Sequence, residues 1–138
     1  MKRFDILEHT ADVGIVAYGK SLKEVFENTA LGMFSLIVDP RTVRERVCYD
    51  VRVENEEKED LLVEWLNELL YIFEVNKVVF KKLKALRLKD ERFLEAKACG
   101  ERIDLRRHQF EIQIKGCTYH ELRVEKDKTW RAQVIFDV

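Results

Sequence analysis

The clearest secondary-structure signal lies in residues 43–73, which read VRERVCYDVRVENEEKEDLLVEWLNELLYIF. From Val43 to Glu54 apolar and charged residues largely alternate, which is the two-residue period of a strand with one face on a core and the other in water. From Leu61 to Phe73 the apolar residues recur every three to four positions, as on a mostly buried helix. The acidic residues 55–60 between them suit the positive end of a helix dipole. This segment therefore predicts a one-sided strand followed directly by a helix.

Another helix is predicted upstream, after Ser21. Ser21 and Glu24 have capping-box spacing, apolar residues follow at helical intervals, and Asp39-Pro40 ends the pattern. Before this helix, two short strands are predicted at 4–7 and 13–18, on either side of the polar residues 8–12.

The second half of the chain is rich in strand-like runs joined by short polar turns. A break in alternation at Lys81-Lys82 predicts a bulge. The runs cover residues 78–88, 92–99, 110–115, 119–125 and 129–138. Because helices do not follow every strand, we predict an α+β two-layer sandwich, with a largely antiparallel or mixed sheet packed on two main helices.

Length and composition predict one domain, residues 1–138, with a sizeable core. The chain has 25 Lys and Arg and 26 Asp and Glu, so a charged content of 37% leaves a net charge of only −1. We therefore expect no direct nucleic-acid binding, although an average does not exclude a local basic patch. No apolar run reaches the length of a bilayer span, and acids interrupt the first residues. We expect no membrane association and a cytoplasmic location.

The three cysteines are Cys48, Cys99 and Cys117, with no C-x-x-C spacing. They are predicted to be reduced core thiols rather than a disulfide framework. Cys117 and His120 have the C-x-x-H spacing of half a zinc site, but the second pair, Cys99 with His108, has unusual spacing. Core thiols are therefore favoured over zinc.

The C-terminus offers the most informative chemistry. Strand alternation continues through Val138, so the terminal carboxylate is predicted to be held at a fixed place beside the side chain of Asp137. A third carboxylate would complete a site for calcium or magnesium, and Asp12 in the polar segment is the natural candidate. The alternative is that Asp137 is a solvated residue on the outer face of an edge strand.

Three further residues have both a functional and an ordinary interpretation. His9 lies beside Asp12 and is either part of the site or a satisfied hydrogen-bonding group. Lys115 could contact a phosphate or a partner carboxylate, or is simply solvated. Glu101, which follows Gly100, is either a turn acid or a site acid.

Taken together, these segments resemble the archease family. The resemblance runs from end to end and rests on H-T-A-D at 9–12, W-L-N-E-L-L-Y at 65–71, Gly100-Glu101, residues 115–120 and the terminal F-D-V at 136–138. Gly116-Cys117 departs from the pattern, because the family more often has alanine and an aliphatic residue there.

The resemblance implies a non-catalytic activator of the GTP-dependent tRNA-splicing RNA ligase, which promotes guanylylation and repeated turnover of that partner. It also implies a metal site formed by Asp12, Asp137 and the terminal carboxylate of Val138, with calcium or another hard divalent cation as the ion. His9, Glu101, Lys115 and His120 are then candidates for partner or supporting contacts.

Two other functions remain open. One is a chaperone or specificity modulator of tRNA-modifying methyltransferases, a role also proposed for proteins that resemble this one. The other is a metal-dependent phosphohydrolase that uses Asp12 and Asp137, but no second acidic cluster accompanies them in the sequence. The oligomeric state is left open.

Overall fold

The computed structural model describes residues 2–8 and 12–138. Its elements follow in the order β1 (Phe4–Glu8), β2 (Val13–Gly19), α1 (Leu22–Ile37), the short 3-10 helix η1 (Pro40–Thr42), β3 (Val47–Glu54), α2 (Lys58–Asn76), β4 (Val78–Lys89), β5 (Phe93–Arg102), β6 (Gly116–Lys126) and β7 (Trp130–Asp137). No helix in this described part of the chain has both the length and the apolar character needed to cross a membrane.

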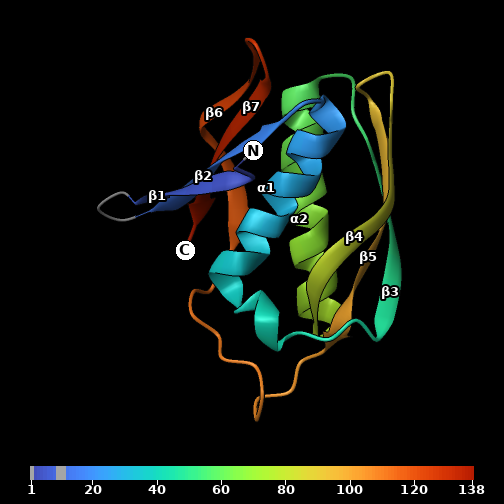
Figure 1. Ribbon diagram of the computed structural model, residues 1–138, viewed down its shortest axis with the longest axis vertical. Helices are drawn as coiled ribbons and strands as arrows, with labels where there is room; N and C mark the ends of the chain where they lie inside the picture. The colour runs from blue at the N-terminus through green and yellow to red at the C-terminus, as the bar shows by residue number, and fades with distance from the viewer. Residues whose placement is uncertain (1, 9–11) are drawn as a thin grey trace.

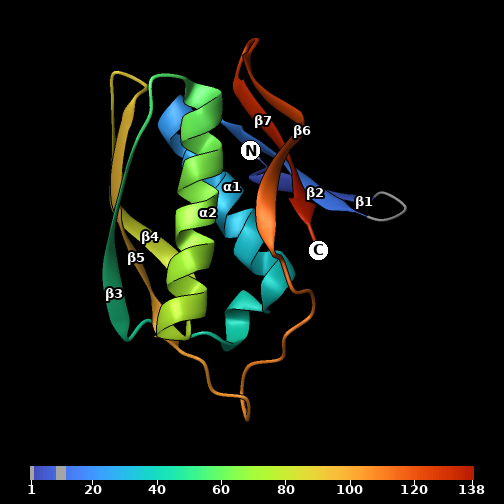
Figure 2. The same cartoon turned by 180° about the vertical axis from the view of Figure 1, so that it is seen from behind.

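The strands form two antiparallel sheets, and the α+β prediction is confirmed. One sheet has the order β1-β2-β7-β6 and the other the order β3-β5-β4. Figures 1 and 2 show α1 and α2 side by side between the two sheets, so each helix packs on a sheet at either side. The strands thus divide where the sequence analysis expected one sheet, because each helix has apolar side chains toward both sheets and these need two apolar sheet faces.

The two helices begin as the sequence predicts and are tied together in the core. The Ser21 side chain accepts a hydrogen bond from the Glu24 N–H at 3.1 Å, which satisfies one free donor of the first turn of α1. Trp65 of α2 is fully buried, and its indole N–H donates to the Phe26 carbonyl of α1 at 3.0 Å. This bond fixes the rotation of α2 about its axis, and with it the direction of its other side chains.

Two boundaries of the β3-β5-β4 sheet have clear physical causes. β3 begins at Val47 rather than Val43, because Val43 follows η1 and is buried there. The predicted bulge is confirmed by a register shift between Phe80 and Lys82. At the same place Gly100 approaches β4 so closely that a Cβ atom would lie 1.8 Å from the Val79 carbonyl oxygen.

The predicted strand at 110–115 is wrong. Apart from an isolated bridge between Phe110 and Val38, residues 103–115 form an irregular segment. Ile114 is buried and Ile112 packs against the core. The apolar alternation in residues 110–115 therefore arises because one side of the segment is buried against the core. The segment lacks the ladder of hydrogen bonds that defines a strand.

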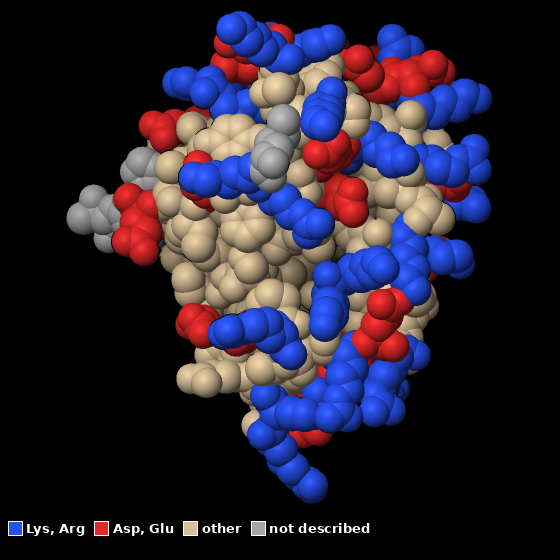
Figure 3. Space-filling model, viewed as in Figure 1, with Lys and Arg blue, Asp and Glu red and all other residues tan. Residues whose placement is uncertain are grey.

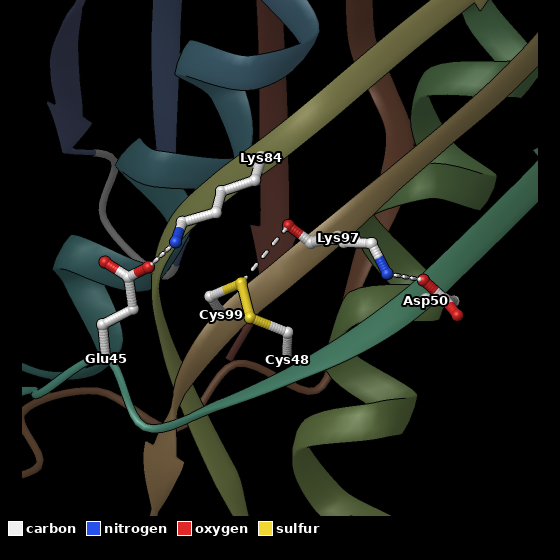
Figure 4. Close-up of a disulfide and its surroundings, with 6 residues drawn as sticks. All are labelled: Glu45, Cys48, Asp50, Lys84, Lys97 and Cys99. Carbon is white, nitrogen blue, oxygen red and sulfur yellow. Dashed lines mark hydrogen bonds and ion pairs between the residues drawn. A yellow bond between two sulfur atoms is a disulfide. The ribbon is translucent and has the colours of Figure 1, made fainter.

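The prediction of reduced cysteines is wrong for two of the three. Cys48 and Cys99 form a disulfide across β3 and β5, with their Cα atoms 4.1 Å apart (Figure 4). The two residues are 51 positions apart in the chain, but the antiparallel register sets them directly opposite each other. Cys117 is free and buried, as expected.

Candidate metal site

The predicted metal ligands meet at one end of the β1-β2-β7-β6 sheet. The β2–β7 ladder runs from Gly19 opposite Trp130 to Val13 opposite Phe136. Extending this register by one residue brings Asp12 beside Asp137, and the chain ends at the next residue. Figure 2 shows the C-terminus at the same end of the sheet as the β1–β2 hairpin. We call Asp12, Asp137 and Val138 the acidic tip.

The backbone of the acidic tip is held on both sides. β7 lies between β2 and β6, so Asp137 is not on an edge strand as the alternative interpretation required. The Lys115 N–H donates to the Asp137 carbonyl at 2.7 Å, and Gly116 pairs with Asp137 in the β6–β7 ladder. Lys115 is therefore brought to the tip, with its side chain exposed.

Asn67 is a positioning residue that the sequence analysis did not single out. From α2 its Oδ1 accepts the Cys117 N–H at 2.8 Å, while its Nδ2 donates to the Cys117 carbonyl at 3.4 Å. The pair anchors the start of β6 to the helix, immediately beside the residue that pairs with Asp137. A polar amide inside the apolar W-L-N-E-L-L helix was the available signal for this role.

The donor set of the acidic tip fits a hard cation. Two side-chain carboxylates and one terminal carboxylate are oxygen donors of the kind that calcium takes. The nearby Cys117 is not a competing ligand, because burial raises the pKa of its thiol to about 12 and keeps it protonated. Asp137 and Val138 are exposed and Asp12 is partly so, which leaves room for an ion and a partner.

Charge also favours an ion at this place. Like charges on neighbouring strands destabilise a sheet, and a bound cation offsets that repulsion. Within residues 2–8 and 12–138, no side-chain hydrogen bond or ion pair occupies Asp12 or Asp137. The same described ranges hold no group of three His, Cys, Asp or Glu side chains around one point. Only two of the three predicted ligands are side chains of these types, so the predicted site would not form such a group.

A further carboxylate, Glu8, lies at the same end of the sheet. Glu8 closes β1 opposite Val13, next to the start of the ladder that leads to Asp12. Its side chain is exposed. Sequence reasoning treated it only as part of the polar segment, although a carboxylate at the last position of β1 was a usable signal.

Glu101 is not at the acidic tip. It lies in β5 of the other sheet, is buried, and accepts hydrogen bonds from Arg107 Nη2 at 2.6 Å and Arg107 Nη1 at 2.8 Å. The Arg44 N–H donates to the same carboxylate at 2.6 Å. These donors, Arg107 first, hold the pKa of Glu101 far below its usual range. Its role is that of an anchor for the irregular segment that follows β5.

His108 completes this buried cluster. The Asp104 N–H donates to His108 Nδ1 at 2.9 Å, so Nδ1 carries no hydrogen and the neutral ring has its proton on Nε2. That Nε2–H donates to Glu101 Oε2 at 3.0 Å. All three side chains of the Glu101–Arg107–His108 cluster are thus satisfied by structural contacts.

His120, the remaining candidate in the described ranges, lies farther along β6 than Gly116, the residue that pairs with Asp137. His120 is exposed on β6, where its N–H bonds to Thr118 Oγ1 at 3.3 Å. Cys117, its C-x-x-H partner, is buried, and Cys99 forms a disulfide with Cys48. Neither cysteine is therefore presented as a zinc ligand beside His120. His9 lies outside the described residues.

The architecture and the tip together define a class of small α+β protein whose candidate chemistry is presented at the end of a sheet rather than inside a cavity. Residues 4–138 match the model of the Archease protein family. The chain belongs to the archease family.

Relatives and solved structures agree with this assignment. The archease of Methanosarcina acetivorans is 43% identical over 141 residues, covering 99% of this chain and 97% of its own. That of Thermococcus gammatolerans is 42% identical over 142 residues and covers both chains fully. The solution structure of protein 1598 of Methanobacterium thermoautotrophicum shares the fold with a TM-score of 0.81, 35% identity and full coverage of both chains.

A more distant structure has the same fold. The crystal structure of a Thermotoga maritima archease, described as a possible chaperone, is 20% identical, with a TM-score of 0.65 over 96% of this chain and 94% of that one.

Proposed function

We propose that this protein is a non-catalytic activator of the GTP-dependent RNA ligase that joins tRNA halves. It promotes formation of the ligase's guanylate adduct and repeated turnover. The acidic tip binds calcium, or another hard divalent cation, and docks at the ligase active site. Family membership supports this activity class, and the resemblance of the H-T-A-D and terminal F-D-V segments supports the ligand set.

The observation that carries the proposal is the register of β2 and β7. Val13 of β2 pairs with Phe136 of β7. Asp12 precedes Val13 and Asp137 follows Phe136, so both acids belong to the sheet end that also carries Val138. One carboxylate from the residue before β2 and two from the last two residues of the chain would give an oxygen-rich site without any thiol or imidazole.

The chain's own residues position and present charge; they do not react. Asp12, Asp137 and the Val138 carboxylate would hold the ion, and the ion, when bound, supplies positive charge at the tip. Lys115 and Asn67 keep the strands of the tip in register. Lys115 also extends an exposed ammonium group beside the tip, suited to a carboxylate or phosphate of the partner.

The test is single-turnover guanylylation of the cognate ligase with GTP. We expect the wild-type chain to accelerate adduct formation and Asp137→Ala to lose the acceleration. The matched control is Asp127→Ala, which removes an exposed acid at the β6–β7 turn, at the other end of β7. Equal stimulation by Asp137→Ala and wild type would exclude the acidic tip from the activity.

A chaperone or specificity modulator of tRNA-modifying methyltransferases is the second candidate. It is favoured by the description of the Thermotoga maritima protein as a possible chaperone. This function predicts altered site selectivity or reduced aggregation of a methyltransferase, with no change in adduct formation by the ligase.

A further inference from the structure

Positive charge is concentrated on one side of this nearly neutral protein. Residues 77–92, which include all of β4, contain seven Lys and Arg but only two Asp and Glu. Figure 3 shows Lys and Arg gathered along the side that carries β4 and β5 and down to the segment below them. The net charge of −1 therefore coexists with a local excess of positive charge around β4.

The first part of this surface is a lysine cluster on β4. The side chain of Lys84 contacts the Glu45 carboxylate (Figure 4). The pKa of Glu45 is lowered by that hydrogen bond and, to a smaller extent, by the positive charges of Lys82 and Lys81. Lys81, Lys82 and Lys84 are all exposed, so three ammonium groups accompany one carboxylate and the cluster keeps an excess of positive charge.

The second part is an arginine-lined groove of about 680 Å³. Its walls include Arg46, Arg102, Arg106 and Arg107. Arg107 is committed to the buried carboxylate of Glu101, and Arg46 approaches the same carboxylate at 4.0 Å while staying largely exposed. Arg102 and Arg106 are exposed as well. Asp104 is the remaining acid of the groove, so the exposed cations outnumber it.

The two parts are continuous. Glu45, at the centre of the lysine cluster, lies between Arg44 and Arg46 in the chain, and Arg46 lines the groove. The Arg46 N–H donates to the Gly100 carbonyl at 2.7 Å, which fixes this segment against β5. Cations from β4, the segment before β3 and the segment after β5 therefore form one surface.

We propose that this surface binds the phosphate backbone of single-stranded RNA. We name it the basic face and define it by Arg44, Arg46, Lys81, Lys82, Arg102 and Arg106. It goes beyond the activator function, and only the choice of RNA over DNA rests on that function.

The chemistry of the basic face favours a polynucleotide over an acidic peptide. Guanidinium groups bind phosphates through paired N–H donors, and their planes stack on unpaired bases. Leu105, 80% exposed at the groove, adds an apolar contact for a base but nothing for a carboxylate. The cations also come from three separate segments, β4, the segment before β3 and the end of β5 with the segment after it, which suits an extended ligand with regularly repeated charge.

The position of the basic face leaves the acidic tip free. It lies on the β3-β5-β4 sheet, and the helices separate that sheet from the one that ends in Asp137 (Figure 1). One molecule could thus hold RNA on one side while the tip contacts a protein partner on the other.

The experiment is fluorescence anisotropy of a labelled 20-nucleotide oligouridine titrated with the full chain. We expect a dissociation constant in the micromolar range at 50 mM salt, weakening roughly 100-fold at 200 mM if about five phosphates are neutralised. Lys81→Gln/Lys82→Gln and Arg102→Gln/Arg106→Gln should each weaken binding about 10-fold. Each pair should also reduce the slope of log binding constant against log salt concentration by about 1.4 in magnitude.

The matched control is Lys20→Gln/Lys23→Gln, which removes the same charge from exposed positions at the start of α1. Equal losses in the control and the basic-face variants, or no binding by wild type, would overturn the proposal. Tighter binding of polyglutamate or of the deoxyuridine oligomer than of the RNA would overturn it as well. So would self-association, seen by sedimentation, that the basic-face variants abolish while RNA binding persists.

Guanylylation of the ligase requires GTP and no RNA. Failure of RNA binding and failure of the activator function are therefore separate results.

Discussion

Arg107 donates two hydrogen bonds, 2.6 and 2.8 Å long, to the buried carboxylate of Glu101. Its Nη1 also donates to the Thr42 carbonyl at 2.9 Å. One guanidinium group thereby ties the irregular segment after β5 to the strand and to η1. This cluster, rather than a network of strands, holds residues 103–108 on the protein.

Replacing Glu101 with Gln should destabilise the protein by about 3 kcal/mol, because it leaves the charge of Arg107 without its buried partner. Urea unfolding of wild type and variant measures this loss. Glu45→Gln, which removes an exposed carboxylate, is the control and should cost much less. Similar midpoints for Glu101→Gln and wild type would show that the cluster contributes little.

We expect the stability of the protein to depend on pH through the same Glu101 carboxylate. The pKa of Glu101 is lower in the folded chain than its ordinary value of 4.5, so its stabilising effect is complete above that value and is lost as the pH falls below it. Stability measured from pH 6 to pH 2.5 should fall less steeply in Glu101→Gln than in wild type. Parallel curves would assign acid sensitivity to other groups.

Removing the disulfide should lower stability. Cys48 and Cys99 close a loop with a sequence separation of 51 residues. By lowering the entropy of the unfolded chain, a cross-link over a loop of this length contributes up to about 4 kcal/mol to the free energy of unfolding. We expect Cys48→Ser/Cys99→Ser to melt at a lower temperature than the oxidised wild type and at nearly the same temperature as wild type in reductant. A thiol titration that finds three free cysteines in the oxidised protein would contradict the pairing.

Calcium should raise the melting temperature through the acidic tip. A ligand present at 100 times its dissociation constant stabilises a folded protein by about 2.7 kcal/mol. Asp137→Asn should abolish the calcium effect and, in chelator, should be no less stable than wild type because it removes one of two adjacent like charges. Asp127→Asn should respond to calcium as wild type does, and a full calcium response in Asp137→Asn would remove that residue from the ligands.

Deleting Val138 tests the terminal carboxylate by itself. The truncation moves this charge back by one residue, to a position that faces the other side of the sheet. We expect calcium binding, followed by calorimetry, to weaken at least tenfold while the melting temperature in chelator stays close to that of wild type. Unchanged calcium affinity would show that Asp12 and Asp137 need other ligands.

Asn67 should act on the tip from a distance. Asn67→Ala removes two hydrogen bonds to Cys117 and should cost about 1–2 kcal/mol, because a partly buried N–H is left without its acceptor. Hydrogen exchange should speed up at the amide of Cys117. Gln109→Ala, at an exposed position, is the control, and unchanged exchange in Asn67→Ala would contradict the anchoring role.

Sequence reasoning succeeded where the controlling interaction is local. The capping box at Ser21, the change of period between β3 and α2, and the bulge beside Lys82 all depend on neighbours within a few positions, and the structure confirms each. The backbone positions of Asp12 and Asp137 were also accessible, because the first precedes β2 and the second ends β7, while their role as metal ligands stays a prediction.

It failed where apolar alternation had a different cause. Residues 110–115 alternate because Ile112 and Ile114 lie against the core, and periodicity cannot tell that burial from a strand ladder. Glu101 likewise has the sequence context of a turn acid or a site acid, and only its contact with Arg107 distinguishes a structural anchor.

By itself, then, the sequence determined the kinds and order of most helices and strands, because turns, caps and hydrophobic periods are local properties of the chain. Tertiary structure decided which strands share a sheet, that Cys48 meets Cys99, and that cations from three segments form one face. Those relationships arise from the register between strands far apart in the chain, which is set only when both sheets close over the two helices and bury them.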